Sequence, residues 1–462
     1  MKKTAILIFA AAGMLAAASC NKALTPAEMP ENTVWTTVVE AAKGPDTKAL
    51  AYEGAALVAS WATTDNVYVL AGSESKGVMH PQSAAETAVL SGTLTGTFTV
   101  GDELKLRYPV LEPKYDTQEG TLEFLAENCD VGEATVTVTS VDTENKILTL
   151  SSAKFEPQQS IVQFEAHPIV KTLVISTPGL DYNITVTPTD LSTNLIYVAI
   201  PEHGSDKQLI SFFGKGVDDK TRIGVSAAKS VNGKFYRAPL QMDEVRSVDL
   251  GLSVLWSESN LGADIIFEGD KRMIYGQYYA WGETVPKLNY AGSTYKFWSG
   301  DAFTKYTGSD GLPRLEAEDD AAQVLLGEGW RMPTRAEVEE LALTNERYRQ
   351  KVGIDESTYT GPTFEWNYQK FSGSEQYLGF AVTSSITEKT IILPFTSLYT
   401  GEELYSVSTS LKNILAIWTS DLSAENPKNA YTLFSDLYPL ETMTTSHLNR
   451  FWGLPIHPVK DK

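Results

Sequence analysis

Short runs of alternating or β-branched apolar residues dominate the chain from residue 49 to about residue 243. Clear examples cover residues 66–70, 133–139, 172–175 and 182–186. Val, Ile, Thr, Tyr and Phe recur in these runs, and Gly, Asp, Asn and Pro separate them, which is the pattern of strands joined by turns. Almost no helical stretch intervenes. The region therefore predicts antiparallel β-sandwiches, either one large sandwich or two small ones.

A different pattern begins near residues 241–246, where Trp and Gly become frequent and one helix stands out. Thr334 predicts the N-cap of this helix, and Glu337 predicts the acidic partner of a capping box three residues later. Apolar residues then recur at helical spacing at Val338, Leu341 and Ala342. This change of pattern indicates a second module after residues 241–246, and the α+β fold over residues 246–462 is what the family resemblance given below implies.

The first 20 residues combine two lysines, an apolar run and small residues before a cysteine. Lys2 and Lys3 precede the apolar run 5–18, and Cys20 follows Ala18 and Ser19. This is the pattern of a lipoprotein signal peptide, which is cleaved before the cysteine. A transmembrane helix needs about 20 apolar residues, and this run is shorter. We expect residues 1–19 to be removed and the thiol of Cys20 to carry the lipid that anchors the chain in a membrane.

Residues 20–48 have a low density of apolar residues and are rich in Pro, Ala, Glu and Thr. Such a composition predicts a lipidated N-terminus and flexible tether that holds the folded body away from the lipid headgroups. Within it, residues 33–40 alone have the pattern of a strand.

Charge and cysteine content exclude some classes of protein. The formal net charge is −20, so a phosphate backbone would be repelled, and nucleic-acid binding is not expected. If Cys20 carries lipid, Cys129 has no partner within the chain for a disulfide. A buried small residue is the commoner role for such a cysteine, and a reactive thiol is the alternative.

The sequence contains few arrangements of residues that are typical of catalysis or metal binding. Five histidines are scattered without metal-ligand spacing, and no nucleophile elbow or phosphate-binding loop is present. An acidic cluster precedes the helical region at Glu316, Glu318, Asp319 and Asp320. Neighbouring carboxylates usually form a solvated face or a helix start, although they could also bind calcium. We therefore predict no catalytic residues, no cofactor and no metal, and the chain is not expected to be an enzyme.

The region of strands resembles the fimbrillin-like family of Bacteroidetes surface lipoproteins. The resemblance begins at Trp61-Ala62-Thr63-Thr64-Asp65-Asn66, where the family usually has a Trp and a Gly-Asp pair. It continues at residues 108–109, 120–122, 151–157 and 233–236. The resemblance implies two transthyretin-like sandwiches, over residues 49–168 and 169–245. In some members, cleavage after an N-terminal Arg opens a groove for a partner's strand, but the first arginine here is Arg107.

Residues 246–462 resemble the Fibrobacter succinogenes major paralogous domain, which implies a variant of the C-type lectin-like fold. The matching blocks occur in the family's order at residues 248–256, 260–263, 275–283, 319–322, 329–334, 392–395, 417–420 and 453–459. His457 stands where the family usually has Arg. The triplets of a lectin calcium site are absent, since only Trp418-Thr419-Ser420-Asp421 and Glu425-Asn426-Pro427 occur in their place. Calcium-dependent sugar binding is accordingly not expected.

Two roles are open to the tryptophans of this module. Large rings beside glycines suit a core in which the backbone passes close by. We assign that role to Trp256, Trp281, Trp330 and Trp418. Exposed rings can instead stack on sugar faces. The candidates for ligand binding lie outside the motif blocks or at their edges, and they are Trp298, Trp366 and Trp452.

These observations favour a non-enzymatic lipoprotein of the outer membrane, on the cell surface, that acts as an adhesin or as an accessory or tip component of a fimbria. Its expected partners are the membrane, through the lipid, and pilus subunits, a host protein or a glycan. A carbohydrate-binding lipoprotein that captures glycans is the alternative. An enzyme of the sulfatase-activating branch of the lectin-like folds is disfavoured, because a second cysteine is missing.

Overall fold

The computed structural model describes residues 33–43, 51–53, 56–58, 60–203, 209–227, 229–264, 274–370, 377–405, 414–436 and 444–462. The predicted signal peptide and the lipidation residue Cys20 lie outside them. Within the described residues, no helix is long and apolar enough to span a membrane. The chain divides into two units, and each is considered by itself.

The first unit is a β-barrel built from residues 33–42, 61–107 and 133–155 of the described chain. Its strands pair in the order β10-β1-β6-β5-β4-β7-β9, and β10 also pairs with β9, so the sheet closes on itself. The strands are β1 (Val34–Ala42), β4 (Val67–Ala71), β5 (Glu74–Pro81), β6 (Thr87–Thr95), β7 (Glu103–Tyr108), β9 (Gly132–Asp142), β10 (Ile147–Leu150) and β11 (Ala153–Lys154). Closure leaves no long row of unpaired backbone groups along the sheet.

Strand β1 alternates between buried and exposed positions along its length. Trp35, Thr37, Val39 and Ala41 face the core and are buried. The indole Nε1 of Trp35 donates a 2.8 Å hydrogen bond to the carbonyl of Gly96. The strand pattern at residues 33–40 is thus confirmed, and its assignment to the tether is corrected, because the inward side chains of β1 fill the barrel.

The second unit begins with a β-sandwich whose layers are the three-stranded sheet β16-β13-β19 and the six-stranded sheet β20-β18-β17-β14-β15-β8. A large apolar cluster fills the space between the two sheets. The elements are β8 (Thr117–Gln118), α1 (Leu122–Asn128), β12 (Glu156–Pro157), β13 (Gln159–His167), β14 (Val170–Ser176), β15 (Ile184–Val186), β16 (Leu195–Pro201), β17 (Ile210–Gly216), β18 (Thr221–Ser226), β19 (Phe235–Gln241) and β20 (Asp243–Glu244), with a separate hairpin of β2 (Ala51–Glu53) and β3 (Ala56–Val58).

The border predicted between residues 168 and 169 does not separate two bodies. Strand β13 ends at His167 and pairs with β16 and β19, which lie beyond that border. The physical reason is that β13 supplies Val162 and Phe164 to the core of this sandwich. The second sandwich therefore starts well before residue 169.

The C-terminal module is made of several small sheets and short helices around two apolar clusters. Its sheets are β21-β22-β34-β25, β23-β24, β26-β27-β28, β29-β30 and β31-β32-β33. The strands are β21 (Ser247–Asp249), β22 (Leu255–Ser257), β23 (Trp298–Ser299), β24 (Ala302–Phe303), β25 (Trp330–Arg331), β26 (Glu365–Lys370), β27 (Tyr377–Thr383), β28 (Thr390–Pro394), β29 (Leu398–Thr400), β30 (Glu403–Tyr405), β31 (Ile414–Leu422), β32 (Asn429–Asp436), β33 (Thr444–Asn449) and β34 (Val459–Lys460). The helices are η3 (Gly292–Thr294), η4 (Ala317–Asp319), α2 (Ala321–Leu326), α3 (Arg335–Leu343) and α4 (Glu346–Lys351).

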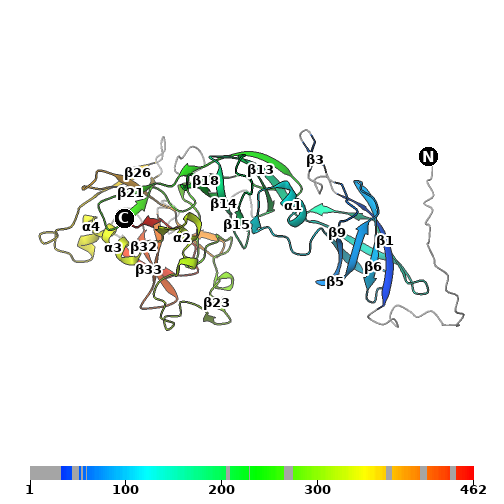
Figure 1. The fold of residues 1–462 in the computed structure, drawn as a ribbon. Coiled ribbons are helices and arrows are strands. Elements are labelled where there is room, and N and C mark those ends of the chain that lie inside the picture. The colour runs from blue at the N-terminus through cyan, green and yellow to red at the C-terminus, as the bar shows by residue number, and fades with distance from the viewer. Residues whose placement is uncertain are drawn as a thin grey trace. The chain divides into compact units, whose positions relative to one another are not determined.

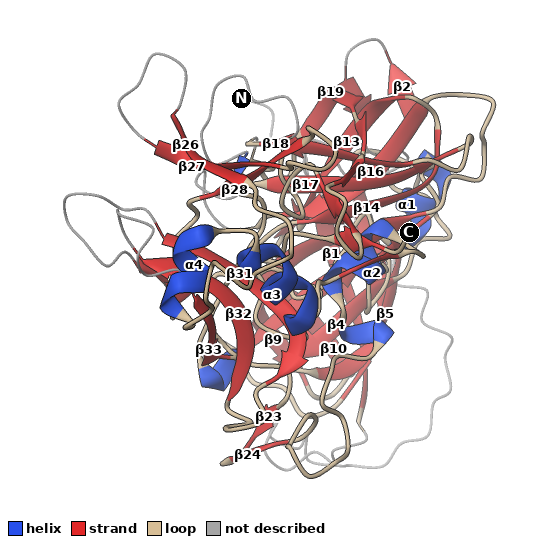
Figure 2. Cartoon of the chain, turned by 90° about the vertical axis from the view of Figure 1, so that its left-hand side faces the viewer, coloured by secondary structure: helices blue, strands red, loops and turns tan. Residues whose placement is uncertain are grey.

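Helix α3 confirms the local prediction. Thr334 is the N-cap, and the carboxylate of Glu337 accepts a 2.7 Å hydrogen bond from the backbone N–H of Thr334. The buried residues of α3 are Val338, Leu341 and Ala342. The helix lies beside the sheet β31-β32-β33 (Figure 2).

The second sandwich and the C-terminal module share one core, although the sequence places a border at residues 245–246. Phe213 of β17 and Ile223 of β18 belong to the same apolar cluster as Leu261 and Tyr279 of the module. The hydroxyl of Ser211 also donates a 3.0 Å hydrogen bond to the carbonyl of Gly262. Sandwich and module are therefore one packed unit.

Candidate functional site

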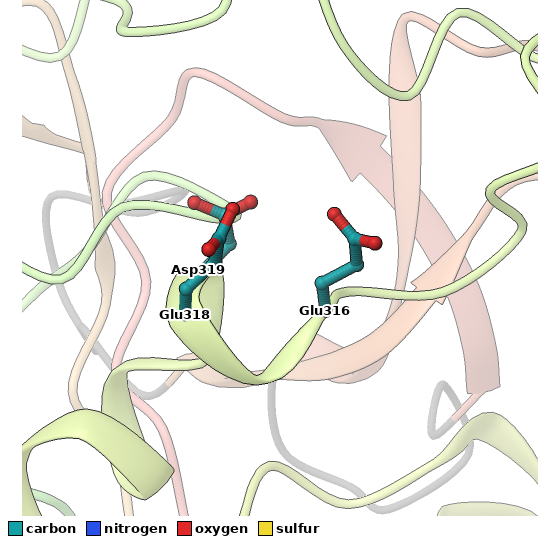
Figure 3. A group of neighbouring side chains, drawn as sticks. All are labelled: Glu316, Glu318 and Asp319. Carbon is teal, nitrogen blue, oxygen red and sulfur yellow. The ribbon is translucent and has the colours of Figure 1, made fainter.

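The acidic cluster predicted from the sequence is present, but lysines occupy it. Ligand oxygens of Glu316, Glu318 and Asp319 lie within 4.8 Å of one another (Figure 3). Lys305 Nζ lies 2.6 Å from Glu316 Oε2, 3.1 Å from Glu318 Oε1 and 2.6 Å from Asp319 Oδ2. Lys296 Nζ lies 2.7 Å from the other oxygen of Asp319. An ammonium group thus stands where a metal ion would have to bind.

The protonation states of this cluster favour ion pairing. Burial raises the pKa of Asp319, but the hydrogen bonds from Lys296, Lys305 and Tyr306 more than reverse this and leave the pKa below its ordinary value. Burial lowers the pKa of Lys305, and its hydrogen bonds to the carboxylates outweigh that effect and raise the pKa well above its usual range. Asp319 therefore stays ionised and Lys305 stays protonated.

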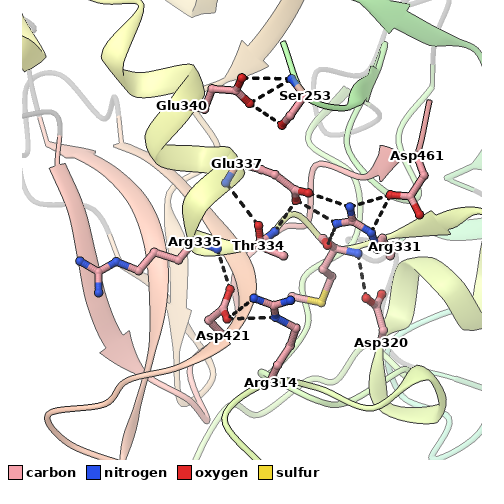
Figure 4. A network of polar contacts seen from close by, with 11 residues as sticks. Ser253, Arg314, Asp320, Arg331, Thr334, Arg335, Glu337, Glu340, Asp421 and Asp461 are labelled. Atoms are coloured by element: carbon pink, nitrogen blue, oxygen red, sulfur yellow. Dashed lines mark hydrogen bonds and ion pairs between the residues drawn. The ribbon is translucent and has the colours of Figure 1, made fainter.

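A second polar network surrounds Arg331 in β25 (Figure 4). Its guanidinium donates to both carboxylate oxygens of Glu337, at 2.8 and 2.7 Å, and to Asp461 at 2.7 Å. Asp421 accepts from the guanidinium of Arg314 and from the backbone N–H of Arg335. The network joins the start of α3, the strand β25 and the C-terminal residues, so its visible role is structural.

Asp320, the last member of the predicted acidic cluster, has a separate structural role. Its Oδ1 caps α2 by accepting from the backbone N–H groups of Ala322 and Gln323, and its Oδ2 accepts from Met332. Burial raises the pKa of Asp320, against the effect of these hydrogen bonds. The prediction that this cluster contains a helix start is confirmed for Asp320.

The four tryptophans assigned to the core are buried. Trp256, Trp281 and Trp418 are 0% exposed and Trp330 is 5% exposed, which confirms their assignment to the core. Trp366, one of the three candidates for ligand binding, is also buried.

Trp366 cannot offer a ring face to a ligand. It lies on the inward side of β26, 9% exposed, and its Nε1 donates a 3.0 Å hydrogen bond to Thr344 Oγ1. Alternation along the strand turns it to the same side as Phe364, toward the apolar cluster. Trp298 and Trp452 are half-buried and pack against the other cluster, so the structure does not bring the three candidates together. Ligand binding by Trp298 and Trp452 stays a prediction.

Cys129 is buried, which agrees with the role of a buried small residue that the sequence favours. Its thiol donates to the carbonyl of Lys114 over 3.3 Å. Burial and the neighbouring charge of Asp130 raise the pKa of Cys129 to about 12, so the thiolate is not formed at neutral pH.

Within the second unit, a cleft lies where the sandwich meets the C-terminal module. Its volume is about 690 Å³. One wall is the β14–β15 loop with Gly179, Leu180 and Asp181, and the other is the module segment from Glu283 to Asn289. Asn183 Nδ2 donates a 3.0 Å hydrogen bond to the carbonyl of Thr284 and holds the walls together. We call this space the junction cleft.

An ion-paired group forms the floor of the junction cleft. Glu283, 6% exposed, accepts from Lys287 Nζ at 2.8 Å and from the backbone N–H of Lys296 at 2.6 Å. Lys287 Nζ also donates to the carbonyl of Thr294 at 2.6 Å. Burial raises the pKa of Glu283, and the charges and hydrogen bonds of Lys287 and Lys296 oppose that rise.

A smaller lobe of about 270 Å³ lies beside the junction cleft and shares Lys287 and Leu288 with it. Tyrosines line this aromatic lobe. The ring of Tyr399 stacks on Tyr290 at 5.6 Å and meets Tyr278 edge-on at 4.8 Å. Leu288, between the two spaces, is 42% exposed.

Sequence reasoning did not single out these cleft residues. The block at residues 275–283 matches a fold motif, and nothing in its pattern marks Glu283 as the floor of a cleft. Lys287, four residues after Glu283, is the one local signal, because charges at that spacing often pair. The opposite wall comes from the sandwich, about a hundred positions earlier in the chain.

No protein-family model matches the chain, and no curated protein matches it. Among solved structures, a candidate cell adhesion protein from Bacteroides uniformis is 11% identical over 45% of this chain and 97% of its own, with a TM-score of 0.26. A fimbrial assembly protein from Parabacteroides distasonis is 7% identical over 46% of this chain and 99% of its own, with a TM-score of 0.25. The C-terminally truncated tip fimbrial protein Mfa3 from Porphyromonas gingivalis is 8% identical over 42% of this chain and 81% of its own, with a TM-score of 0.23. Similarity at this level assigns no function to this chain.

Proposed function

We propose that this chain is a non-enzymatic lipoprotein of the cell surface that serves as an adhesin or as a terminal or accessory component of a fimbria. Cys20 carries its lipid anchor, and the second unit carries its binding surface. The observation that carries the proposal is the closed barrel of the first unit.

Strand β1 completes the barrel from within the chain. It pairs antiparallel with β6 from Val34↔Thr95 to Ala42↔Thr87, and parallel with β10 and β11 on its other side. A repeating pilus subunit that accepts a partner's strand needs an open groove. A barrel that already holds its own strand suits an end or an anchor of an assembly better than its repeating shaft.

The second unit suits a binding role. Sandwich and module share a core, so the module's loops are held on a rigid base, which lowers the entropic cost of ordering them on binding. Among the described residues, the carboxylates around Asp319 and around Arg331 are ion-paired within the fold. Their carboxylates are committed to packing the module, which favours binding over chemistry.

The experiment that tests the proposal expresses the full chain, with its leader, in a bacterium that processes lipoproteins. Cys20→Ser is compared with Cys129→Ser, its matched control, because these are the two cysteines of the chain. We expect the wild type and Cys129→Ser to enter the membrane fraction with a mass gain of a diacylglycerol, and Cys20→Ser to lack both. Cells that display the wild type should bind immobilised matrix proteins or retain pilus subunits after detergent extraction.

Two results would count against this function. The first is membrane association without added mass on Cys20, which would show that a lipid on Cys20 is not the anchor. The second is a displaying strain that binds no more matrix protein, and holds no more pilus subunit, than the Cys20→Ser strain.

A further inference from the structure

We propose that the junction cleft together with the aromatic lobe is a binding site for a short, neutral oligosaccharide. This inference rests on the proposed function, because it names the kind of ligand that the adhesive unit would hold. It is argued from the walls, the charges and the apolar surface of the cleft.

The two spaces form one continuous site. Both are lined by Lys287 and Leu288, and both receive the β14–β15 loop, through Pro178 in the lobe and Gly179 to Asp181 in the cleft. Leu288 is a ridge between them. A ligand that crosses this ridge would contact both spaces, and a chain of two or three sugar rings has the required length.

The walls are fixed before a ligand arrives. Glu283, Lys287 and the backbone of Lys296 hold one another, and Tyr278, Tyr290 and Tyr399 pack as a group. The backbone of Tyr290 is also hydrogen-bonded to Gly401 in both directions. A preformed cleft of this kind loses little conformational entropy on binding. It can therefore bind a ligand that buries only a small apolar surface.

The charges of the junction cleft balance. Its lining includes two carboxylates, of Asp181 and Glu283, and two ammonium groups, of Lys287 and Lys296. The aromatic lobe adds one carboxylate, that of Glu402, so the whole site has no positive excess that would attract a polyanion. Acceptors and donors stand side by side instead, and a sugar hydroxyl can act as both.

The apolar part of the site matches the other property of a sugar, its C–H faces. Leu288 and Leu404 are 42% and 48% exposed, and Tyr399 is half-buried beside them. Aromatic and aliphatic surface next to a few fixed polar groups is the usual composition of a ligand site. An extended peptide is the competing occupant, and the experiment includes it.

The test uses the soluble chain from residue 21 to 462 and a panel of neutral oligosaccharides built from glucose, mannose, galactose and N-acetylglucosamine. An extended neutral peptide is measured alongside them as the competing occupant. Lactose and sialyllactose form a matched pair that differs by one charged sugar. Binding is measured by saturation-transfer NMR and calorimetry. We expect at least one neutral member to bind, and lactose to bind no more weakly than sialyllactose.

Variants locate the site. Leu288→Asp and Asp181→Ala should each weaken binding of that saccharide about tenfold or more, as changes at the centre of a ligand site do. Val324→Asp, at another exposed apolar residue, and Asp301→Ala, at another exposed aspartate, are the matched controls and should bind as the wild type does. All four variants should keep the wild-type thermal midpoint within a few degrees.

Three results would overturn the inference: no neutral member of the panel binds, Leu288→Asp binds as tightly as Val324→Asp, or the cleft prefers sialyllactose or a peptide. In each case the display experiment with Cys20→Ser still reports separately on adhesion. A chain that anchors and adheres but binds no saccharide would refute the ligand and leave the proposed function standing.

Discussion

The guanidinium of Arg450 donates a 2.9 Å hydrogen bond from Nε to the hydroxyl oxygen of Tyr295, in the interior of the C-terminal module. Arg450 is 0% exposed. Its other nitrogens donate to the backbone carbonyls of Tyr306, Pro427 and Lys305. The guanidinium carbon, Cζ, lies 4.0 Å from the centroid of the Phe303 ring. One buried cation thus joins three loops through neutral oxygens and an aromatic ring.

Replacing Arg450 by Met should destabilise the second unit strongly. The substitution removes this partner from the buried carbonyl of Tyr306 and from the partly buried carbonyls of Lys305 and Pro427. Each buried group that is left unsatisfied costs about 1–3 kcal/mol. We expect a loss of at least about 3 kcal/mol in urea unfolding followed by tryptophan fluorescence. Arg347→Met, at an exposed arginine, is the control and should change stability by less than about 0.5 kcal/mol. Equal midpoints for the two variants would show that Arg450 does not hold the loops.

His457 should make the stability of the module depend on pH. Its ring is 0% exposed and lies 2.9 Å from the carbonyl of Ser257, and burial lowers its pKa to about 4 although that hydrogen bond opposes the shift. Because the unfolded histidine has the higher pKa, the unfolded state takes up the proton first as the pH falls. The stability that neutral His457 contributes is complete above about pH 6.5 and is lost between about pH 6.5 and 4.

The expected loss between pH 7.5 and pH 5 is about 2 kcal/mol from this residue alone. Denaturant unfolding at the two pH values measures it. His457→Gln should lower this dependence by that amount, whereas His167→Gln, at an exposed histidine, should leave it unchanged. If His457→Gln and the wild type show parallel pH profiles, His457 does not fold as the neutral form.

Local sequence determined the capping box of α3, because its signals lie within four residues of one another. Thr334 and Glu337 are in direct contact in the structure, as the sequence predicts. The same reasoning could not place β1. Its residues 33–40 have a strand pattern, but the partners β10 and β11 lie more than a hundred positions away, and no short-range signal links them.

The junction cleft could not be predicted from the sequence for a related reason. Asn183 and Thr284, which join its walls, are 101 positions apart. Trp366 shows the opposite error, because its place outside the motif blocks predicts exposure, whereas alternation along its strand turns it into the core. Position relative to a motif carries less information than alternation along a strand.

Trp366→Ala should therefore lower the stability of the second unit. Removing a buried Trp from a packed core costs about 3–5 kcal/mol, and the hydrogen bond to Thr344 is lost as well. Trp298→Ala, at a half-buried ring that packs edge-on against Phe303, should cost clearly less. Thermal unfolding of the two variants side by side measures the difference. A Trp366→Ala chain that is as stable as the Trp298→Ala chain would contradict the packing described for β26.

Calcium should have no stabilising effect through the acidic cluster, because Lys305 occupies it. Adding millimolar Ca²⁺ should leave the thermal midpoint of the wild type unchanged. Lys305→Ala removes the ammonium group shared by Glu316, Glu318 and Asp319, so we expect a lower midpoint without calcium. Lys389→Ala, at an exposed lysine, serves as the control. A calcium-dependent rise of the wild-type midpoint that Glu316→Gln abolishes would show that the cluster binds the ion with Lys305 in place.

The closed barrel predicts that the folded chain does not take up a foreign strand. A fluorescent peptide with the sequence of residues 33–43 should not bind the soluble wild type, because β1 already fills its place between β6 and β10. A variant that lacks residues 33–42 opens that place and exposes two strands with unpaired backbone groups, which are competent to pair. It should therefore capture the peptide, measured by fluorescence anisotropy, and regain thermal stability on doing so. The same peptide with Trp35→Asp and Val39→Asp should fail in both respects, because these side chains would enter the barrel core. Exchange of the peptide into the intact wild type would instead mean that β1 is replaceable, and the chain could then join an assembly as a repeating subunit.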